Sequence, residues 1–84
     1  MASVEERVIQ VTARVLELDP AQIELHHVFT TDLGAESVQS VELVAMFEEE
    51  FGIEMDEDEA LSVTNVGDAV AYITKVCEEQ GAET

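Results

Sequence analysis

The stretch Asp32-Leu33-Gly34-Ala35-Glu36-Ser37-Val38 decides how this chain is organised, because it places a serine at the start of a helix. Gly34 indicates a turn ahead of that helix, since glycine accepts backbone conformations with positive φ. Residues 38–51 then carry several glutamates and no basic side chain. Serine often caps a helix, which is the ordinary interpretation of Ser37. Because nothing beside it is suited to activate the hydroxyl, the other interpretation is an attachment point, at a helix end that favours phosphate.

Acidic residues dominate the charge of the chain. There are 20 Asp and Glu against 3 Lys and Arg, a formal net charge of -17. Eleven of the acids lie between residues 32 and 59, where there is no basic residue. Such a field repels nucleic acid and anionic lipid and attracts basic protein surfaces. We therefore expect no nucleic-acid binding, no membrane insertion, and partners with basic docking patches.

The length of 84 residues, with 46% apolar, predicts one domain over residues 1–84 with a modest core. Residues 81–84 are expected to fray. Cys77 is the only cysteine, which excludes an internal disulfide and a cysteine-rich metal site. Glu5, Glu6 and Arg7 interrupt any secretory segment, so we expect a cytoplasmic protein. We also expect a monomer. The volume is too small for an oxyanion hole and a substrate pocket, so an enzyme is not expected.

The first helix is predicted from its cap and its period. Ser3 and Glu6 form a capping box, and the apolar residues that follow recur at steps of three and four. This periodicity predicts a helix that ends near Leu18, before Asp19-Pro20. A long loop over residues 19–36 follows, and its apolar side chains are expected to hold it against the core. They are Ile23, Leu25, Val28, Phe29 and Leu33.

The second helix is predicted to begin at Ser37, or one residue either side, and to end at Gly52. Leu43, Phe47 and Phe51 form a line suited to the core. A second apolar line on the same helix predicts a contact surface. Its members are Val38, Val41 and Ala45.

Two further helices complete the expected fold. Asp56 is the predicted N-cap of a short third helix, and Asn65 caps a fourth whose inner stripe includes Ile73 and Cys77. No segment alternates in the manner of a strand. The fold class is therefore all-α, a four-helix bundle of three long helices and one short third helix, with a long loop between the first two.

Several segments together closely resemble the acyl carrier proteins. They are residues 32–38, Val41-Glu42-Leu43-Val44, Glu48-Glu49-Glu50-Phe51 and Thr64-Asn65-Val66. The resemblance covers nearly the whole chain and implies a free-standing carrier of the bacterial type II kind. It implies that Ser37 carries 4′-phosphopantetheine, taken from coenzyme A, and that the thiol of this arm holds an acyl group. By the same resemblance the attachment site includes Asp32, Gly34, Glu36 and Val38.

The resemblance also implies partners: a phosphopantetheinyl transferase, and enzymes that load, elongate or transfer acyl groups. The side chains expected to contact them are Glu42, Glu48, Glu49, Val41, Met46, Asp56 and Glu57. Met46 is equally expected to fill the core. Acyl chains are expected between the helices, in a cavity that opens only when filled and is lined by residues such as Phe29, Leu43, Phe47 and Ile73.

Three positions depart from the family pattern. Glu36 stands where the family usually has Asp, and Val38 where it usually has Leu. Leu61 is apolar where many relatives expose an acid. These differences favour a specialised carrier in fatty acid, lipid or related biosynthesis.

Other interpretations stay open. An acidic helical interaction module would share the charge but carry no prosthetic group. Peptidyl, polyketide and D-alanyl carriers would share the fold and the serine, and a piece of a larger synthase would have a similar sequence. His26-His27 is not expected to bind metal, because adjacent loop side chains rarely converge and no further His or Cys supports them.

Overall fold

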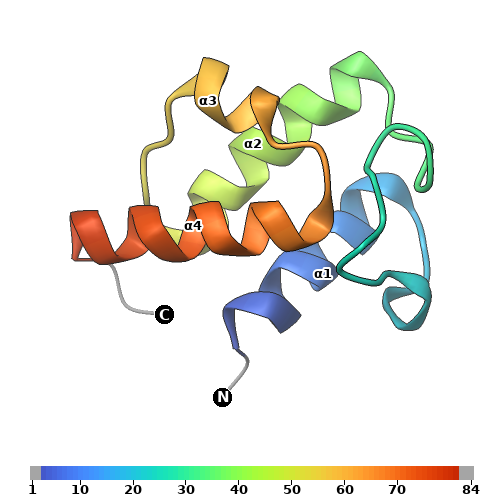
Figure 1. Cartoon of the computed structure of the whole chain (residues 1–84), viewed down its shortest axis with the longest axis horizontal. Helices are drawn as coiled ribbons and strands as arrows, with labels where there is room; N and C mark the ends of the chain where they lie inside the picture. The colour runs from blue at the N-terminus through green and yellow to red at the C-terminus, as the bar shows by residue number, and fades with distance from the viewer. Residues whose placement is uncertain (1–2, 82–84) are drawn as a thin grey trace.

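The computed structural model describes residues 3–81, which fold into four α-helices and one short 3₁₀ helix. They are α1 (Val4–Leu16), η1 (Pro20–Gln22), α2 (Ser37–Phe51), α3 (Glu57–Ser62) and α4 (Val66–Gln80). Helix α1 packs against α2 and α4, and α3 packs against α2. Figure 1 shows α4 running across the view, with α3 above it and α1 below. The predicted all-α bundle of three long helices and one short one is confirmed.

Helix α1 begins as predicted and ends earlier. Both bonds of the predicted capping box are present: the Glu6 amide donates to Ser3 Oγ at 3.2 Å, and the Ser3 amide donates to Glu6 Oε1 at 3.5 Å. The helix stops at Leu16, not near Leu18, because Glu17 turns into the left-handed region at φ 56°. The Leu18 side chain still packs against the core, so the apolar period continues beyond the last helical residue.

The predicted long loop contains one regular turn that the sequence did not reveal. Pro20–Gln22 form η1, and Asp19 Oδ1 accepts a hydrogen bond from the Ala21 amide at 2.9 Å. Ile23 and Phe29 are buried, as expected of side chains that hold the loop to the core. Leu25 does not share this role, since its side chain is exposed.

The middle of this loop is fastened to the start of α4. The amides of Val66 and Gly67 donate to the carbonyls of His27 and Leu25 at 3.0 and 2.8 Å. A Cβ on Gly67 would lie 3.1 Å from the Leu25 carbonyl oxygen, so only glycine allows this approach without a shift. The loop therefore takes its shape from a distant part of the chain.

The core is formed by side chains from all three long helices. Leu43, Phe47 and Phe51 of α2 are buried, as the sequence predicts, and so are Ile73 and Cys77 of α4. Helix α3 contributes no buried residue. Asp56 and Asn65 cap α3 and α4 as predicted, and Gly52 ends α2 in the left-handed conformation.

Gly81 also has a left-handed conformation and caps the end of α4. It was expected to fray with the residues after it. The rest of that segment, residues 82–84, lies outside the described residues. Within residues 3–81, no helix is both long enough and apolar enough to cross a bilayer.

One basic side chain joins α1 to the end of α2. Arg7 Nε lies 2.9 Å from Glu50 Oε2, and Arg7 Nη2 donates to the Glu50 carbonyl at 2.7 Å. The guanidinium also lies over the Phe51 ring, 4.3 Å from its centroid. The acidic stretch from residue 32 to 59 contains no basic residue, and the fold brings the basic Arg7 side chain to it from α1.

Candidate functional site

Ser37 is the first residue of α2, and its side chain is exposed. The prediction that α2 begins here is confirmed. The N-cap is Glu36, whose amide donates to Gln39 Oε1 at 2.9 Å. Because Glu36 occupies the capping position, the ordinary interpretation of Ser37 as the N-cap is wrong. Its hydroxyl lies at the surface beside the amide groups of the first helical turn, which have no partner within a helix.

The turn before Ser37 is built by two of the predicted site residues, Asp32 and Gly34, together with Ala35. Asp32 Oδ2 accepts a hydrogen bond from the Val28 amide at 2.7 Å, and the Asp32 amide donates to the Val28 carbonyl at 2.9 Å. Gly34 has φ 72°, the positive value that the sequence predicts. Ala35 is buried and its amide donates to the Phe29 carbonyl at 2.8 Å. The loop is thereby closed on itself, and it delivers the chain to the start of α2.

The electrostatics at Ser37 combine two opposite influences. The N-terminal end of α2 carries the positive end of the helix dipole, which favours an anion there. Asp32 and Glu36, which precede the serine in the sequence, are exposed and acidic. A phosphate ester on Ser37 would be stabilised by the helix end, while the surrounding carboxylates would attract a basic partner.

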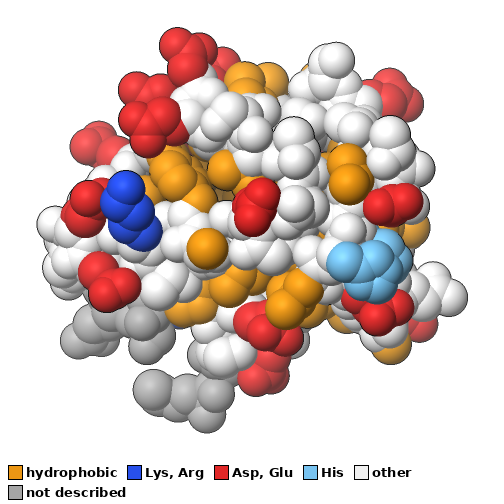
Figure 2. Space-filling model, in the orientation of Figure 1, with side chains coloured by type: hydrophobic (Ala, Val, Ile, Leu, Met, Phe, Trp, Pro, Cys, Tyr) orange, Lys and Arg blue, Asp and Glu red, His pale blue; other side chains and the backbone are white. Residues whose placement is uncertain are grey.

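The predicted partner residues are not equally available. Val38 is 69% exposed and Val41 49% exposed, while Glu42, Glu49, Asp56 and Glu57 are also exposed. Met46 is half-buried and packs against the core. Figure 2 shows acidic side chains crowded around the start of α3.

Glu48 differs from its neighbours because part of its carboxylate is already used. It is half-buried, and its Oε2 accepts a hydrogen bond from the Met55 amide at 2.9 Å. This bond fixes the segment that leads from α2 to α3. The run Glu48-Glu49-Glu50 therefore divides into a loop-fixing residue, an exposed residue and the partner of Arg7.

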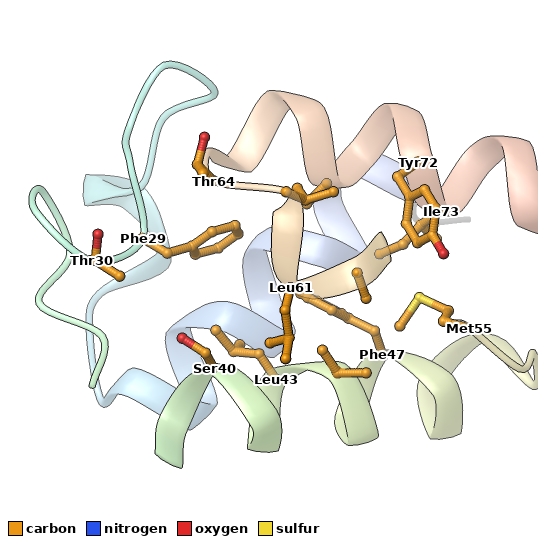
Figure 3. A pocket seen from close by; sticks show the side chains of 14 residues that line it. Phe29, Thr30, Ser40, Leu43, Phe47, Met55, Leu61, Thr64, Tyr72 and Ile73 are labelled. Carbon is orange, nitrogen blue, oxygen red and sulfur yellow. The ribbon is translucent and has the colours of Figure 1, made fainter. Parts of the chain in front are cut away.

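A cavity of about 110 Å³ lies between α2, α3 and α4 (Figure 3). It is already open in the structure, whereas the sequence predicted a space that opens only when filled. Its lining is mostly apolar and includes all four residues that the sequence named for it. The lining residues are Phe29, Thr30, Ser40, Leu43, Val44, Phe47, Met55, Ala60, Leu61, Val63, Thr64, Ala69, Tyr72 and Ile73.

The two ends of the cavity differ in chemistry. Figure 3 shows Thr30, Ser40 and Thr64 at the end nearest the start of α2, with Met55 and Tyr72 at the other. Ser40 follows Ser37 by three residues, a rise of about 4.5 Å along a helix. Ser40 was not predicted as a site residue from the sequence, although its spacing of nearly one turn from Ser37 was a signal for it.

Leu61 points from α3 toward α2 across this cavity and is 41% exposed. An acid at this position would place a charge beside an apolar lining. Burial raises the pKa of the Tyr72 hydroxyl, and the nearby Glu59 carboxylate adds to that shift. The phenol therefore stays neutral near pH 7, so none of the lining side chains carries a charge.

Cys77 is buried in the core, as the sequence predicts. Burial raises the pKa of its thiol, and Arg7 partly opposes that shift. A buried thiol with a raised pKa is a poor nucleophile, because the thiolate is the reactive form. Cys77 is therefore part of the packing.

Comparisons with known proteins agree with this geometry. Residues 6–73 match the family model described as the phosphopantetheine attachment site. The acyl carrier proteins of two Caulobacter vibrioides strains are 44% identical over 75 residues, covering 89% of this chain and 96% of theirs. A solved Mycobacterium tuberculosis structure, provisionally assigned as an acyl carrier protein, superposes with a TM-score of 0.81 at 27% identity. That match covers 87% of this chain and 97% of the other.

Helix α2 begins with an exposed serine, and Ser40, less than one turn later, lines an apolar cavity. Together with these matches, the two observations lead to one conclusion. The chain belongs to the acyl carrier protein family, whose members bear phosphopantetheine and act as carriers, not as enzymes.

Proposed function

We propose that Ser37 is the residue that carries 4′-phosphopantetheine, as a phosphodiester on its Oγ. The observation that supports this best is its position: an exposed hydroxyl at the first residue of α2, three residues before Ser40, which lines an apolar cavity. The helix dipole favours the phosphate at that point. The thiol at the far end of the arm then holds an acyl group as a thioester.

The cavity between α2, α3 and α4 is proposed to shelter the acyl chain. The end with the Ser40 and Thr64 hydroxyls lies toward the start of α2, and mostly apolar side chains line the rest of the cavity. An apolar chain gains about 0.8 kcal/mol for each CH₂ that leaves water. This lining favours a fatty acyl chain over the polar cargo of a peptidyl or D-alanyl carrier.

Partner enzymes are proposed to dock on the exposed face of α2 and the start of α3. Glu42, Glu49 and Glu57 present carboxylates there, and Val41 adds an apolar contact. Each exposed ion pair contributes only about 0–1 kcal/mol, so such contacts speed encounter and permit release. A carrier that visits several enzymes needs that combination.

The remaining partner residues have narrower roles in this proposal. Asp56 offers one carboxylate oxygen, since its Oδ1 accepts a hydrogen bond from the Glu59 amide at 3.0 Å. Glu48 likewise has one oxygen to offer, and Met46 contributes only its exposed edge. The transferase and the acyl-handling enzymes are the proposed partners of this monomeric, cytoplasmic carrier.

The pathway is proposed to be a specialised branch of fatty acid, lipid or related biosynthesis. Glu36 and Val38 flank Ser37, and both are exposed to any enzyme that approaches it. Leu61 adds an apolar side chain at the cavity. A chain that supports general fatty acid synthesis enzymes as well as a housekeeping carrier would contradict this part of the proposal.

Intact mass spectrometry tests the attachment site. The protein is incubated with coenzyme A and a phosphopantetheinyl transferase, and a single phosphopantetheine adduct is expected. Ser37→Ala should abolish the adduct, whereas Ser40→Ala, a serine three residues later on the same helix, should keep it. An adduct that persists in Ser37→Ala would refute the assignment. The group held as a thioester on protein purified from its natural source then identifies the cargo.

A further inference from the structure

The loop between α1 and α2 brings three metal-ligating side chains together. The rings of His26 and His27 have centroids 4.6 Å apart and planes tilted by 60°. One ligand atom each from Glu24, His26 and His27 lies within 4.8 Å of the other two. The expectation that these neighbouring side chains point apart is therefore wrong. Figure 2 shows the histidine side chains as one surface patch with acidic side chains around it.

We propose that Glu24, His26 and His27 form a binding site for a divalent transition metal of the zinc class. Two imidazole nitrogens and one carboxylate oxygen are donors that zinc prefers. Magnesium and calcium select oxygen donors, so the two histidines distinguish this site from the carboxylates elsewhere on the surface. Three protein ligands leave the remaining coordination position to water.

The spacing requires only small side-chain movements. Ligand atoms bound to one zinc at about 2.1 Å in tetrahedral geometry lie roughly 3.4 Å apart. Atoms now within 4.8 Å must therefore approach by up to about 1.4 Å. Glu24 and His26 are exposed and His27 is half-buried, so rotation of the side chains can close that gap.

The backbone under the site is already ordered. The carbonyls of Leu25 and His27 accept hydrogen bonds from α4 amides, at 2.8 and 3.0 Å. Binding metal therefore does not require the loop to be ordered first, which lowers the entropic cost.

The His27 ring is held by one hydrogen bond that the metal would replace. The Glu24 amide donates to His27 Nδ1 at 3.1 Å, so the lone pair of Nδ1 faces the Glu24 residue. Coordination through Nδ1 exchanges this bond for a metal bond. The released amide belongs to an exposed residue and can be satisfied by water.

The charge of the chain favours a cation without selecting which one. With 20 acids against 3 bases, the chain concentrates divalent cations at its surface. Any test must therefore separate the histidine site from general screening. The proposal is independent of the assignment of Ser37, since the site contains no part of α2.

Calorimetric titration of zinc chloride into the unmodified full chain tests the proposal. The unmodified form is used because the thiol of the arm would itself bind zinc. In excess magnesium, one zinc per chain is expected, and the ring signals of His26 and His27 should shift in nuclear magnetic resonance spectra. His26→Gln and His27→Gln should each weaken binding at least about tenfold.

The matched control is Glu57→Gln, which removes one carboxylate from the start of α3 and should leave zinc binding unchanged. Circular dichroism checks that each variant is folded, and the ring signals of the unaltered chain give a result that needs no variant. Zinc that excess magnesium displaces, or that binds equally well to both histidine variants, would overturn the proposal.

Discussion

Replacement of Arg7 by alanine tests the one basic contact that the fold brings to the acidic end of α2. That end carries Glu48, Glu49 and Glu50, which oppose the helix dipole, and it has no basic residue of its own. Arg7 reaches it from α1 with two hydrogen bonds to Glu50 and a contact over a phenyl ring. We expect its loss to weaken the contact between α1 and the end of α2 and to lower the free energy of unfolding.

The magnitude follows from the three contacts. The 2.7 Å bond to the Glu50 carbonyl is charge-assisted and stabilises by about 1.5 kcal/mol. The ion pair, with side chains 22% and 32% exposed, adds about 0.5 kcal/mol. The cation–π contact with Phe51 adds about 0.5 kcal/mol. Arg7→Ala should therefore cost about 2–3 kcal/mol, which lowers the Tm by roughly 10–20 °C.

Urea unfolding followed by circular dichroism measures this free energy. Arg14→Ala is the matched control, because Arg14 is exposed on the same helix and carries the same charge. Glu50→Gln should cost less than Arg7→Ala, since the carbonyl bond and the ring contact survive it. If Arg7→Ala costs no more than Arg14→Ala, the contacts contribute only as an ordinary surface ion pair, and the reasoning is refuted.

Four further outcomes follow from other features. Glu17→Gly should raise the free energy of unfolding in urea by about 0.5–1 kcal/mol, because glycine adopts its left-handed conformation without strain. Burial raises the pKa of the Cys77 thiol from its ordinary 9.0, so the free energy of unfolding should fall as the pH rises above that value. Urea titrations across pH should show a smaller fall for Cys77→Ala. Leu61→Glu should reduce the rise in Tm produced by loading an octanoyl chain. Added salt should raise the Tm by screening the acids, as calorimetry can measure.

Each of these outcomes has a result that would contradict it. An equal gain in Glu17→Ala would assign the effect to charge and not to backbone conformation. Identical pH profiles for the unaltered chain and Cys77→Ala would contradict the effect of burial. An equal loss in Val41→Glu, a change outside the cavity, would show that Leu61 has no special role there. A Tm that does not change with ionic strength would mean that repulsion between the acidic side chains destabilises the fold only slightly.

Local signals in the sequence predicted the helices well. The caps at Ser3, Asp56 and Asn65 are side chain to backbone contacts over three residues, so the sequence contains the whole interaction. Gly34 and Gly52 were identifiable for the same reason, since their backbone angles are a property of one residue. The end of α1 was placed too late because Leu18 keeps the apolar period after the helix has ended.

Contacts between distant residues were not predictable from the same signals. Arg7 and Glu50 are 43 residues apart in the sequence, and no local pattern links them. Gln80 and the Glu54 backbone form a similar pair at the end of α4. The convergence of His26 and His27 depends on a loop shape that α4 imposes, so spacing alone gave the wrong expectation.

The candidate site was likewise predictable only where its features depend on a short segment of sequence. The place of Ser37 at the start of α2 was predicted from a short motif, whereas its capping role was taken over by Glu36 and Gln39. The cavity was anticipated from apolar residues, but its open state and the place of Ser40 in its lining follow from how α2, α3 and α4 pack. Shape that several helices create together is not contained in any one segment.

The hydrogen bonds between the loop and the start of α4 limit when the loop can fold during synthesis of the chain. The carbonyls of Leu25 and His27 receive their partners, the amides of Gly67 and Val66, from a segment about 40 residues later in the sequence. During synthesis the ribosome releases residues 25–29 long before those amides exist outside it. The segment leading to Ser37 can therefore reach its final shape only after residues 66 and 67 have left the ribosome, and an enzyme that recognises this shape must act after that point.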